Sequence, residues 1–218
     1  MKDYPDITIL PDHEEVLRQL EAYRKTGDRS AFAAPLTFLG EGAGRFAVSY
    51  GGQYCVKYAK NSLGYMQTRA EIAAFAEECP AFVEMVACDA ANCKYVLTKL
   101  LTPLPDGKLG ELTGGLVTDF RRLKVALYDL VATYGMFDYD AAIGYADAHR
   151  TRYADADKLI AAIGRTRDAE DGQFLVFRQL VDFWKDSGKR PFRIFKKENW
   201  CLDSRGGGTV AVVIDAGV

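Results

Sequence analysis

Two oxygen-bearing side chains near the C-terminal end of the sequence have the types and setting of metal ligands. Asn199 ends the basic stretch "FRIFKKEN", and Asp215 follows the apolar run "VAVVI" and precedes "AG". Mg²⁺ prefers oxygen ligands in near-octahedral geometry and takes only one or two protein carboxylates, with phosphate oxygens completing its shell. Asn199 and Asp215 are therefore candidate ligands of one metal site. Taken singly, an Asn that caps a turn or an Asp that ends a strand is also common.

The stretch "LGEGAGRF" places glycines at 40, 42 and 44, where backbone N–H groups can approach a phosphate because no Cβ stands in the way. The following "RFAVSY" has a strand pattern, which excludes a dinucleotide fold, since there the glycines open a helix. The G-K-[ST] of a Walker loop is absent as well. A glycine-rich turn between two strands, over nucleotide phosphates, is the interpretation that remains, although most such turns are only turns.

Lys57 in "YCVKYA" is the first candidate for a phosphate-binding cation. Strand alternation puts Lys57 on one face with two small residues, Cys55 and Ala59. A lysine on a buried face needs an anionic partner, and Glu71 in the next helical segment would supply it if that helix packs on the strands. The alternative is an exposed lysine at a strand edge. Two further glutamates could be the partner instead: Glu77 and Glu78.

Together these features resemble the protein-kinase fold. The shared order is a glycine-rich hairpin, V-x-K on the third strand, a helix with a glutamate, two more strands, a linker and a helical part. Near the end, "FRIFKKEN" aligns without gaps with the catalytic-loop pattern H-R-D-L-x-x-x-N, and "IDAG" is similar to D-F-G. The resemblance covers roughly residues 35–218 and depends on a few spaced residues.

The kinase resemblance implies a protein that binds ATP together with Mg²⁺. Lys57 would bind the α- and β-phosphates, and Glu71 would hold Lys57 in place. Asn199 and Asp215 would be the Mg²⁺ ligands. The other implied contacts come from Gly40, Gly42 and Gly44 over the phosphates, from Leu100 and Leu101 in segment 100–103 beside the adenine edge, and from Lys196 at the γ-phosphate.

The kinase pattern is broken at the catalytic aspartate, which accepts the proton of the substrate hydroxyl. Aligned with H-R-D, this chain has Phe192, Arg193 and Ile194, and isoleucine accepts no proton. Because loss of a general base typically costs about 10²–10⁴-fold in rate, we expect weak or absent transfer. Further departures are Arg45 at the third glycine of the loop, Ala47 for valine, Ala216 for the phenylalanine of D-F-G, and an end one residue after Gly217, before any activation segment.

Three functions follow from these observations. The first is a pseudokinase that holds ATP and Mg²⁺ and transfers phosphate weakly or not at all. The second is an active minimal kinase, similar to short kinase-like proteins of some bacteria and phages, acting on a protein or a small molecule with a non-standard base. The third is a non-enzymatic scaffold for a protein partner. The candidate replacement bases are Asp138, Asp140 and Glu198.

The fold class predicted is α+β: a two-lobed protein-kinase-like fold with an N-terminal five-stranded antiparallel sheet, one inserted helix and a reduced, mainly helical C-terminal lobe. The Pro/Gly-rich "TPLPDGKLGELTGG" marks the boundary. We expect a tail and an extra helix in 1–34, the first lobe in 35–101, and the second lobe with the catalytic-loop and metal hairpin in 102–218.

Periodicity and capping signals place the individual elements. Asp12 and Glu15 form a capping-box pattern that predicts a helix over 12–25. Alternation predicts strands over 36–39, 46–50 and 53–59, a hairpin within 83–101, and short strands at 200–202 and 209–214. Helical spacing of apolar residues predicts helices over 65–78, around 116–131 and 159–163, and over 171–185.

Composition excludes several classes of protein. The 218 residues are 49% hydrophobic and 27% charged with a net charge of −2, so no basic field favours a nucleic-acid partner. Without an apolar run near the roughly 20 residues of a membrane span, or a signal-peptide pattern, a membrane partner is not expected either. Five irregularly spaced cysteines favour a reduced, cytoplasmic chain. The two histidines, His13 and His149, are too far apart to favour zinc.

Overall fold

The computed structural model describes residues 4–188, 192–205 and 208–215. Its chain divides into two compact units. The first consists of Met1–Glu78 with Val83–Leu100, and the second of Cys79–Phe82 with Leu101–Ala216. The three-part division expected from the sequence, with boundaries at 34 and 101, stays a prediction.

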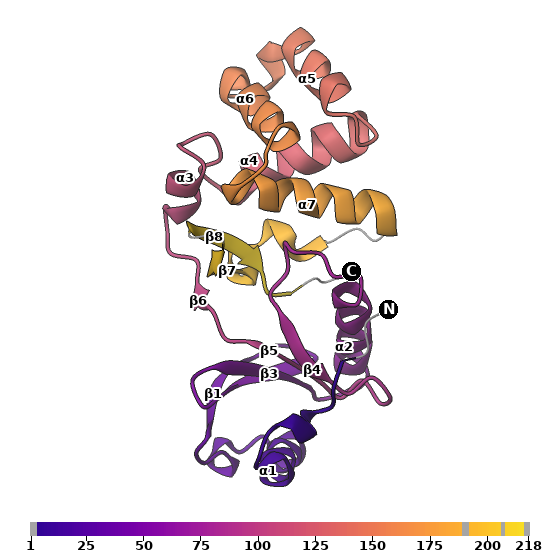
Figure 1. Ribbon diagram of the computed structural model, residues 1–218, viewed down its shortest axis with the longest axis vertical. Coiled ribbons are helices and arrows are strands. Elements are labelled where there is room, and N and C mark those ends of the chain that lie inside the picture. The colour runs from indigo at the N-terminus through magenta and orange to yellow at the C-terminus, as the bar shows by residue number, and fades with distance from the viewer. Residues whose placement is uncertain (1–3, 189–191, 206–207, 216–218) are drawn as a thin grey trace. The chain divides into compact units, whose positions relative to one another are not determined.

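The first unit is built on a five-stranded antiparallel sheet (Figure 1). Its strands lie in the order β1-β2-β3-β5-β4, and the helix α2 (Ser62–Phe75) is inserted between β3 and β4 along the chain. This is the order of elements that the kinase resemblance implies for the first lobe. The strand bounds are β1 Leu36–Glu41, β2 Arg45–Tyr50, β3 Tyr54–Ala59, β4 Met85–Cys88 and β5 Tyr95–Lys99.

One face of this sheet forms the apolar core of the first unit. The strand residues that alternate onto it pack against the helix α1 (His13–Thr26) and the preceding 3-10 turn η1 (Ile7–Ile9). Burying apolar side chains on both sides of such a contact is the main stabilising contribution, at about 25 cal/mol per Å². The buried members of this core include Ile7, Val16, Leu20, Tyr23, Phe46, Val48, Val56, Tyr58 and Leu97.

The start of α1 differs from the predicted capping box. Asp12 stands at the N-cap position, yet its side chain makes no cap hydrogen bond in the described structure. Its Oδ1 instead accepts a hydrogen bond of 2.6 Å from the hydroxyl of Tyr50 on β2. Glu15 binds Arg18 and Gln19 rather than the N-cap backbone. Asp12, which the local sequence assigned to the helix cap, therefore binds the sheet through Tyr50 instead.

The opposite face of the sheet carries α2. The helix begins at Ser62, three residues before the predicted start, because the Asn61 side chain accepts a hydrogen bond from the backbone N–H of Gly64 and caps it. It ends at Phe75, and Glu78 beyond it has a positive φ of 54° that stops further helical turns. The predicted helix over 65–78 is thus present and displaced by three residues.

The second unit is mainly helical, as predicted. Its principal helices are α3 (Lys108–Leu112), α4 (Phe120–Leu123), α5 (Tyr139–Ala148), α6 (Ala156–Arg167) and α7 (Gly172–Ser187). From Lys124 to Tyr134 the chain continues from α4 as a π-helix, η3, with i→i+5 bonds such as Gly135 N–H to Leu130 C=O. Sequence periodicity predicted an ordinary helix there. Short 3-10 turns occur at η2 (Arg29–Ala31, in the first unit), η4 (Arg150–Arg152), η5 (Phe192–Phe195) and η6 (Lys197–Asn199).

A small antiparallel sheet in the second unit includes the predicted terminal hairpin. Strands β7 (Trp200–Arg205) and β8 (Gly208–Val213) pair with Trp200 opposite Val213, and the two-residue β6 (Thr102–Pro103) adds to β7. The outer edge of β8 is also occupied. Gln173 at the start of α7 accepts from the Ala211 N–H at 2.6 Å and donates to the Ala211 C=O at 3.1 Å.

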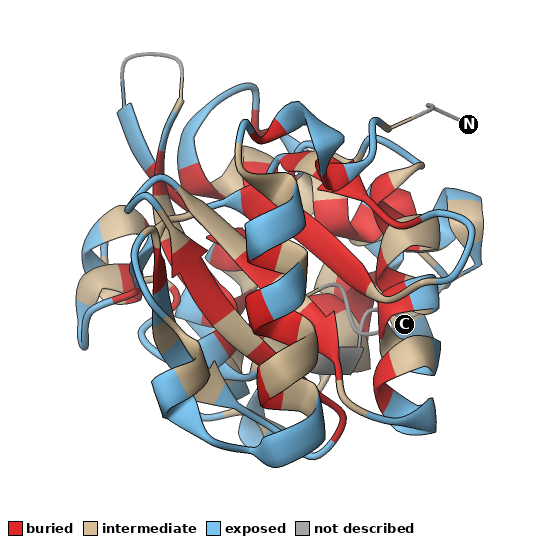
Figure 2. Ribbon diagram, turned by 90° about the horizontal axis from the view of Figure 1, so that it is seen from below, coloured by how far each residue is buried: buried red, intermediate tan, exposed pale blue. Residues whose placement is uncertain are grey.

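The α+β fold class predicted from the sequence is confirmed, with its five-stranded antiparallel sheet, inserted helix and mainly helical remainder. Figure 2 shows the buried residues concentrated along strands and on one side of the helices, with exposed residues on the opposite sides and in the loops. Among the described residues, no helix has the length and apolar content of a membrane span.

Candidate functional site

A buried cluster of three charged side chains lies between the sheet and α2 in the first unit. Lys57 Nζ on β3 is 2.5 Å from Glu71 Oε1 on α2, so the contact expected between these two residues is present. The other carboxylate oxygen, Oε2, accepts a hydrogen bond from Arg45 Nη1 on β2. The side chains are 12%, 1% and 9% exposed for Lys57, Glu71 and Arg45. Glu71 is thus held by two cations in a site with little water.

Strand register explains why the two cations meet at one carboxylate. Lys57 pairs with Ala47, and Arg45 pairs with Ala59, two positions along on the same face of the sheet. Small side chains at 47 and 59 leave room above the sheet for the longer ones. Residues 55, 57 and 59 share this face, as the alternation predicted. The exposed Glu77 and Glu78 lie beyond the end of α2, which leaves Glu71 as the glutamate that contacts Lys57.

The three loop glycines occupy different environments. Gly40 lies in β1, and Gly42 follows it in the turn. A Cβ added at either position would have no other atom closer than 4.0 Å, so a side chain would fit there. A Cβ on Gly44 would instead lie 2.8 Å from the Gly64 nitrogen on α2. The loop also accepts hydrogen bonds from the Lys60 N–H at Gly44 C=O, 2.8 Å, and from the Asn61 side chain at Ala43 C=O, 3.0 Å.

The predicted adenine-edge segment falls where the two units divide. Leu100 belongs to the first unit and Leu101 to the second. The Leu100 N–H donates to the Gln53 C=O at 2.8 Å. Both leucines are half-buried, and their role toward a nucleotide stays a prediction.

Asn199 and Asp215 lie at the same end of the β7–β8 hairpin in the second unit. The Ile214 N–H donates to the Asn199 C=O at 2.8 Å, one step beyond the Trp200–Val213 pair, and Asp215 follows directly. Asn199 is 9% exposed, Asp215 is half-buried, and Lys196 is exposed. Ala216 and Gly217 of the D-F-G-like stretch lie outside the described residues. The structure therefore brings the two predicted ligands to one hairpin end.

The aspartate position of the catalytic-loop pattern is occupied by a core residue. Ile194 is 2% exposed, and its C=O accepts a 2.6 Å hydrogen bond from the indole N–H of the fully buried Trp200. The side chains of Phe192 and Arg193 lie outside the described part of the chain. Position 194 thus serves packing of the second unit.

The replacement bases considered from the sequence have other contacts or an exposed position. Asp138 caps α5 by accepting from the backbone N–H groups of Asp140 and Ala141. Asp140 binds Arg167 on α6. Glu198 is exposed on the turn η6. Their assignment as bases stays a prediction that these contacts do not favour.

Burial alters the ionisation of groups around the first sheet. Cys55, on the same face as Lys57, has its thiol pKa raised chiefly by burial, with the nearby Lys57 charge acting in the opposite direction. Tyr50 has its pKa raised to about 12, first by the hydrogen bond to Asp12 and then by burial. Both groups are therefore neutral at pH 7.

Arg45 is the residue of this cluster that sequence reasoning missed. It was interpreted only as a departure from the glycine pattern, whereas the structure makes it the second partner of Glu71. A signal was present: strand alternation puts residues 45 and 47 on one face of β2, and β2 pairs with β3 through a tight turn. The contact also depends on the register of β2 against β3, which places Arg45 opposite Ala59 and next to Lys57 on that face.

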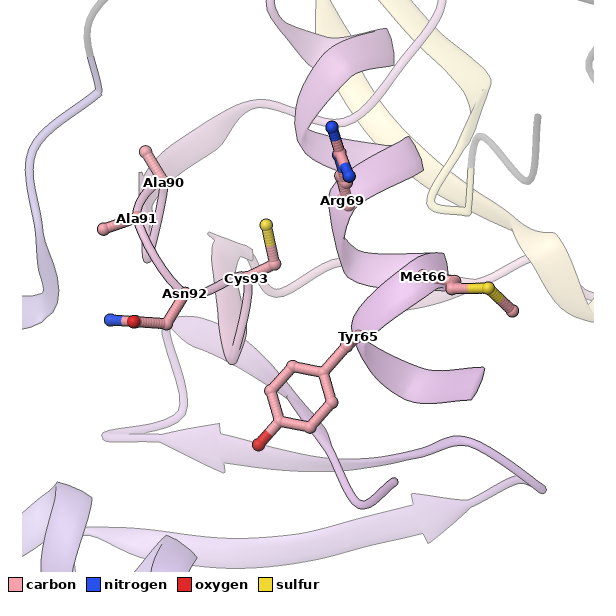
Figure 3. Close-up of a pocket in the computed structure, with 7 residues that line it drawn as sticks. All are labelled: Tyr65, Met66, Arg69, Ala90, Ala91, Asn92 and Cys93. Atoms are coloured by element: carbon pink, nitrogen blue, oxygen red, sulfur yellow. The ribbon is translucent and has the colours of Figure 1, made fainter. Parts of the chain in front are cut away.

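A hollow of about 520 Å³ lies on the other side of α2 (Figure 3). None of the site residues predicted from the sequence lines it. Arg69, which lines this hollow, is exposed, whereas Glu71 two residues later is buried. The lining residues are Tyr65, Met66 and Arg69 of α2 and Ala90, Ala91, Asn92 and Cys93 of the β4–β5 connection.

No protein-family model and no curated protein matches the sequence. Among solved structures, the chain is similar to a GDP and kanamycin complex of an APH(2") enzyme, with 12% identity over 90% of this chain and 72% of that one, at a TM-score of 0.36. For a streptomycin–ATP–APH(2") ternary complex the identity is 16% over 90% of this chain and 70% of that one, at a TM-score of 0.33. For an ADP-bound aminoglycoside phosphotransferase the identity is 13% over 91% of this chain and 70% of that one, at a TM-score of 0.32.

Proposed function

We propose that this chain is a kinase-like protein that binds a purine nucleoside triphosphate with Mg²⁺ and transfers phosphate weakly or not at all. The observation that carries the proposal is the buried ion pair between Lys57 on β3 and Glu71 on α2. It joins the lysine that the kinase resemblance assigns to the phosphates to the glutamate assigned to hold that lysine, on the strand and the helix where the resemblance expects them.

A purely structural role is a weaker account of this pair. Replacing a buried ion pair with well-packed apolar residues is often neutral or stabilising by about 1–4 kcal/mol, because burying charges is costly. A chain that needed only stability would have no use for three charged groups at 1–12% exposure.

The donor set at the hairpin end fits Mg²⁺ only together with phosphate. One amide oxygen from Asn199 and one carboxylate from Asp215 are compatible with an ion that takes one or two carboxylates and completes its octahedron with phosphate and water oxygens. Among the described residues, no group of three or more His, Cys, Asp or Glu side chains could hold a metal. We therefore expect Mg²⁺ to bind with the nucleotide, where it would neutralise phosphate charge.

The weakness of transfer is inferred from position 194. A phosphotransferase normally has an aspartate there to accept the proton of the attacking hydroxyl. Here Ile194 is buried at 2% exposure beside Trp200, and the alternatives Asp138 and Asp140 are engaged in a helix cap and an ion pair. Binding of the nucleotide would then survive without efficient removal of that proton.

The test is thermal unfolding of the full chain with ATP or GTP, each with Mg²⁺ and with EDTA. A ligand at 100 times its Kd adds about 2.7 kcal/mol to stability. For a chain of 150–250 residues this corresponds to about 5–11 °C in Tm. The variants are Lys57→Met and Asp215→Ala, with the exposed Asp157 replaced by Ala as the matched carboxylate control.

We expect the nucleotide to raise the Tm of the wild-type chain and of Asp157→Ala, but not that of Lys57→Met. We expect Mg²⁺ to add to this increase in the wild-type chain and not in Asp215→Ala. Absence of a shift with every nucleotide in the wild-type chain would refute the proposal and favour the scaffold function. Labelled-phosphate transfer from ATP at a rate typical of kinases, about 1–100 s⁻¹, would refute the part that concerns weak transfer.

A further inference from the structure

We infer that Arg45 is a positioning residue that fixes α2 to the glycine-rich hairpin, so that Glu71 holds Lys57 before any nucleotide arrives. The consequence for binding depends on the function proposed above, whereas the attachment of α2 can be measured without a ligand.

The division of the Glu71 carboxylate is the first observation. Oε1 accepts from Lys57 at 2.5 Å and Oε2 accepts from Arg45, so each cation has its own oxygen. A carboxylate bound on both oxygens cannot rotate away from one cation without losing the other. Because Glu71 is 1% exposed, water does not replace a lost partner easily, and each contact is worth more than on the surface.

The position of Arg45 directly after the loop is the second observation. Gly44, its neighbour, contacts the first turn of α2 so closely that a Cβ on Gly64 would lie 2.1 Å from the Gly44 carbonyl oxygen. The Lys60 N–H and the Asn61 side chain bind the same stretch of loop. The hairpin therefore contacts α2 twice: by backbone at Gly64 in the first turn of the helix, and by Arg45 about two turns later at Glu71.

These two attachments prevent α2 from moving as a body away from the sheet. Movement that separated Glu71 from Lys57 would also separate Arg45 from Glu71 and open the Gly44–Gly64 contact. The binding-competent arrangement is thus the resting one. If the arrangement is instead populated only in part, the apparent Kd rises by the inverse of that fraction.

The variants that test this are Arg45→Met, which removes the charge and keeps much of the length, and Arg45→Lys, which keeps a charge. Gly64→Ala opens the backbone contact without touching the ion cluster. Arg69→Met is the control, because Arg69 is an exposed arginine of the same helix that lines the hollow beside the β4–β5 connection and not the ion cluster.

The ligand-free measurement is hydrogen exchange of the α2 amides. We expect Arg45→Met and Gly64→Ala to speed exchange over Ser62–Phe75 at least tenfold relative to α1, Arg45→Lys to restore most of the protection, and Arg69→Met to match wild type. Unchanged or uniformly increased exchange in Arg45→Met would overturn the inference, as would failure of Arg45→Lys to restore protection. If Arg45→Met does not fold, Gly64→Ala and Arg45→Lys decide the matter by the same criterion.

The second measurement is the Kd for Mg·ATP together with the Tm at saturation. If Arg45→Met lowers the assembled fraction to about a tenth, the apparent Kd rises about tenfold, while saturating nucleotide restores wild-type protection of α2. A loss of general stability alone would lower the ligand-free Tm and leave Kd unchanged, which would contradict the inference. If wild type binds no nucleotide, the proposed function fails, and exchange in the ligand-free chain still decides the role of Arg45.

Discussion

Neutralising Glu71 is the perturbation that the first unit should tolerate least. Glu71→Gln keeps the size of the side chain and removes the charge that faces Lys57 and Arg45, at 12% and 9% exposure. Removing one partner of a buried ion pair costs about 3–5 kcal/mol. For a chain of 150–250 residues, that cost lowers Tm by about 6–20 °C.

The assay can locate the loss as well as measure it. Both tryptophans, Trp184 and Trp200, belong to the second unit, so indole fluorescence follows that unit while far-UV circular dichroism follows both. We expect urea unfolding of Glu71→Gln to show an earlier midpoint by dichroism and a smaller change by fluorescence. The wild-type chain, measured with both probes, is the reference.

A triple replacement separates lost charge pairing from lost packing. Arg45→Met, Lys57→Met and Glu71→Leu together exchange the cluster for apolar groups of similar size, which is often neutral or stabilising. We therefore expect the triple variant to recover most of the stability that Glu71→Gln loses. The reasoning would be refuted if the free energy of unfolding of Glu71→Gln lay within about 1 kcal/mol of that of wild type, far less than the usual cost of an unpaired buried charge. A triple variant no more stable than the single one would do the same.

Three further outcomes are expected. Gln173→Ala leaves the buried N–H and C=O of Ala211 without their side-chain partner and should cost about 2–4 kcal/mol by urea unfolding; a change near zero would contradict it. Because the folded-state pKa of Tyr50 is raised to about 12 from 10.0, its stabilising contribution is complete below pH 10 and disappears as pH rises toward 12, so wild type and Tyr50→Phe should converge over that interval. Ile194→Asp should destabilise the second unit, where the residue is 2% exposed, and leave phosphate transfer unimproved; restored transfer would show that position 194 still faces the acceptor.

The elements that could be predicted are those with a strong local pattern. Alternation around Lys57 and the turns beside it gave the strands of the first sheet, and the helical pattern over 65–78 gave α2 to within three residues. The cap at Asn61, which sets the true start of α2, was not recognised. The pairing of Lys57 with Glu71 was expected because helix and strand had to pack. The π-helix η3 and the two-residue β6 were missed, since neither has a sequence pattern that differs from a helix or a loop.

The parts that could not be predicted depend on contacts distant in sequence. Asp12 was assigned to a helix cap on local evidence, but Tyr50, 38 residues away, binds it instead. Arg45 was assigned to the loop, but its partner Glu71 lies 26 residues later and is reached only through the strand register. In both cases a competing tertiary partner outweighs the local rule.

The double hydrogen bond of Gln173 also determines which residues of the last strand face which way. A shift of β8 by one residue would turn every side chain to the other face of its strand. Gln173 binds the backbone N–H and C=O of Ala211 alone, so it marks one position of β8 and fixes the alignment with β7. Asp215 follows Ala211 by four residues, so the position that Gln173 fixes on β8 also sets where Asp215 lies relative to Asn199 at the end of the hairpin. A change at Gln173 should therefore displace Asp215, one of the two proposed Mg²⁺ ligands, relative to Asn199 without altering either residue.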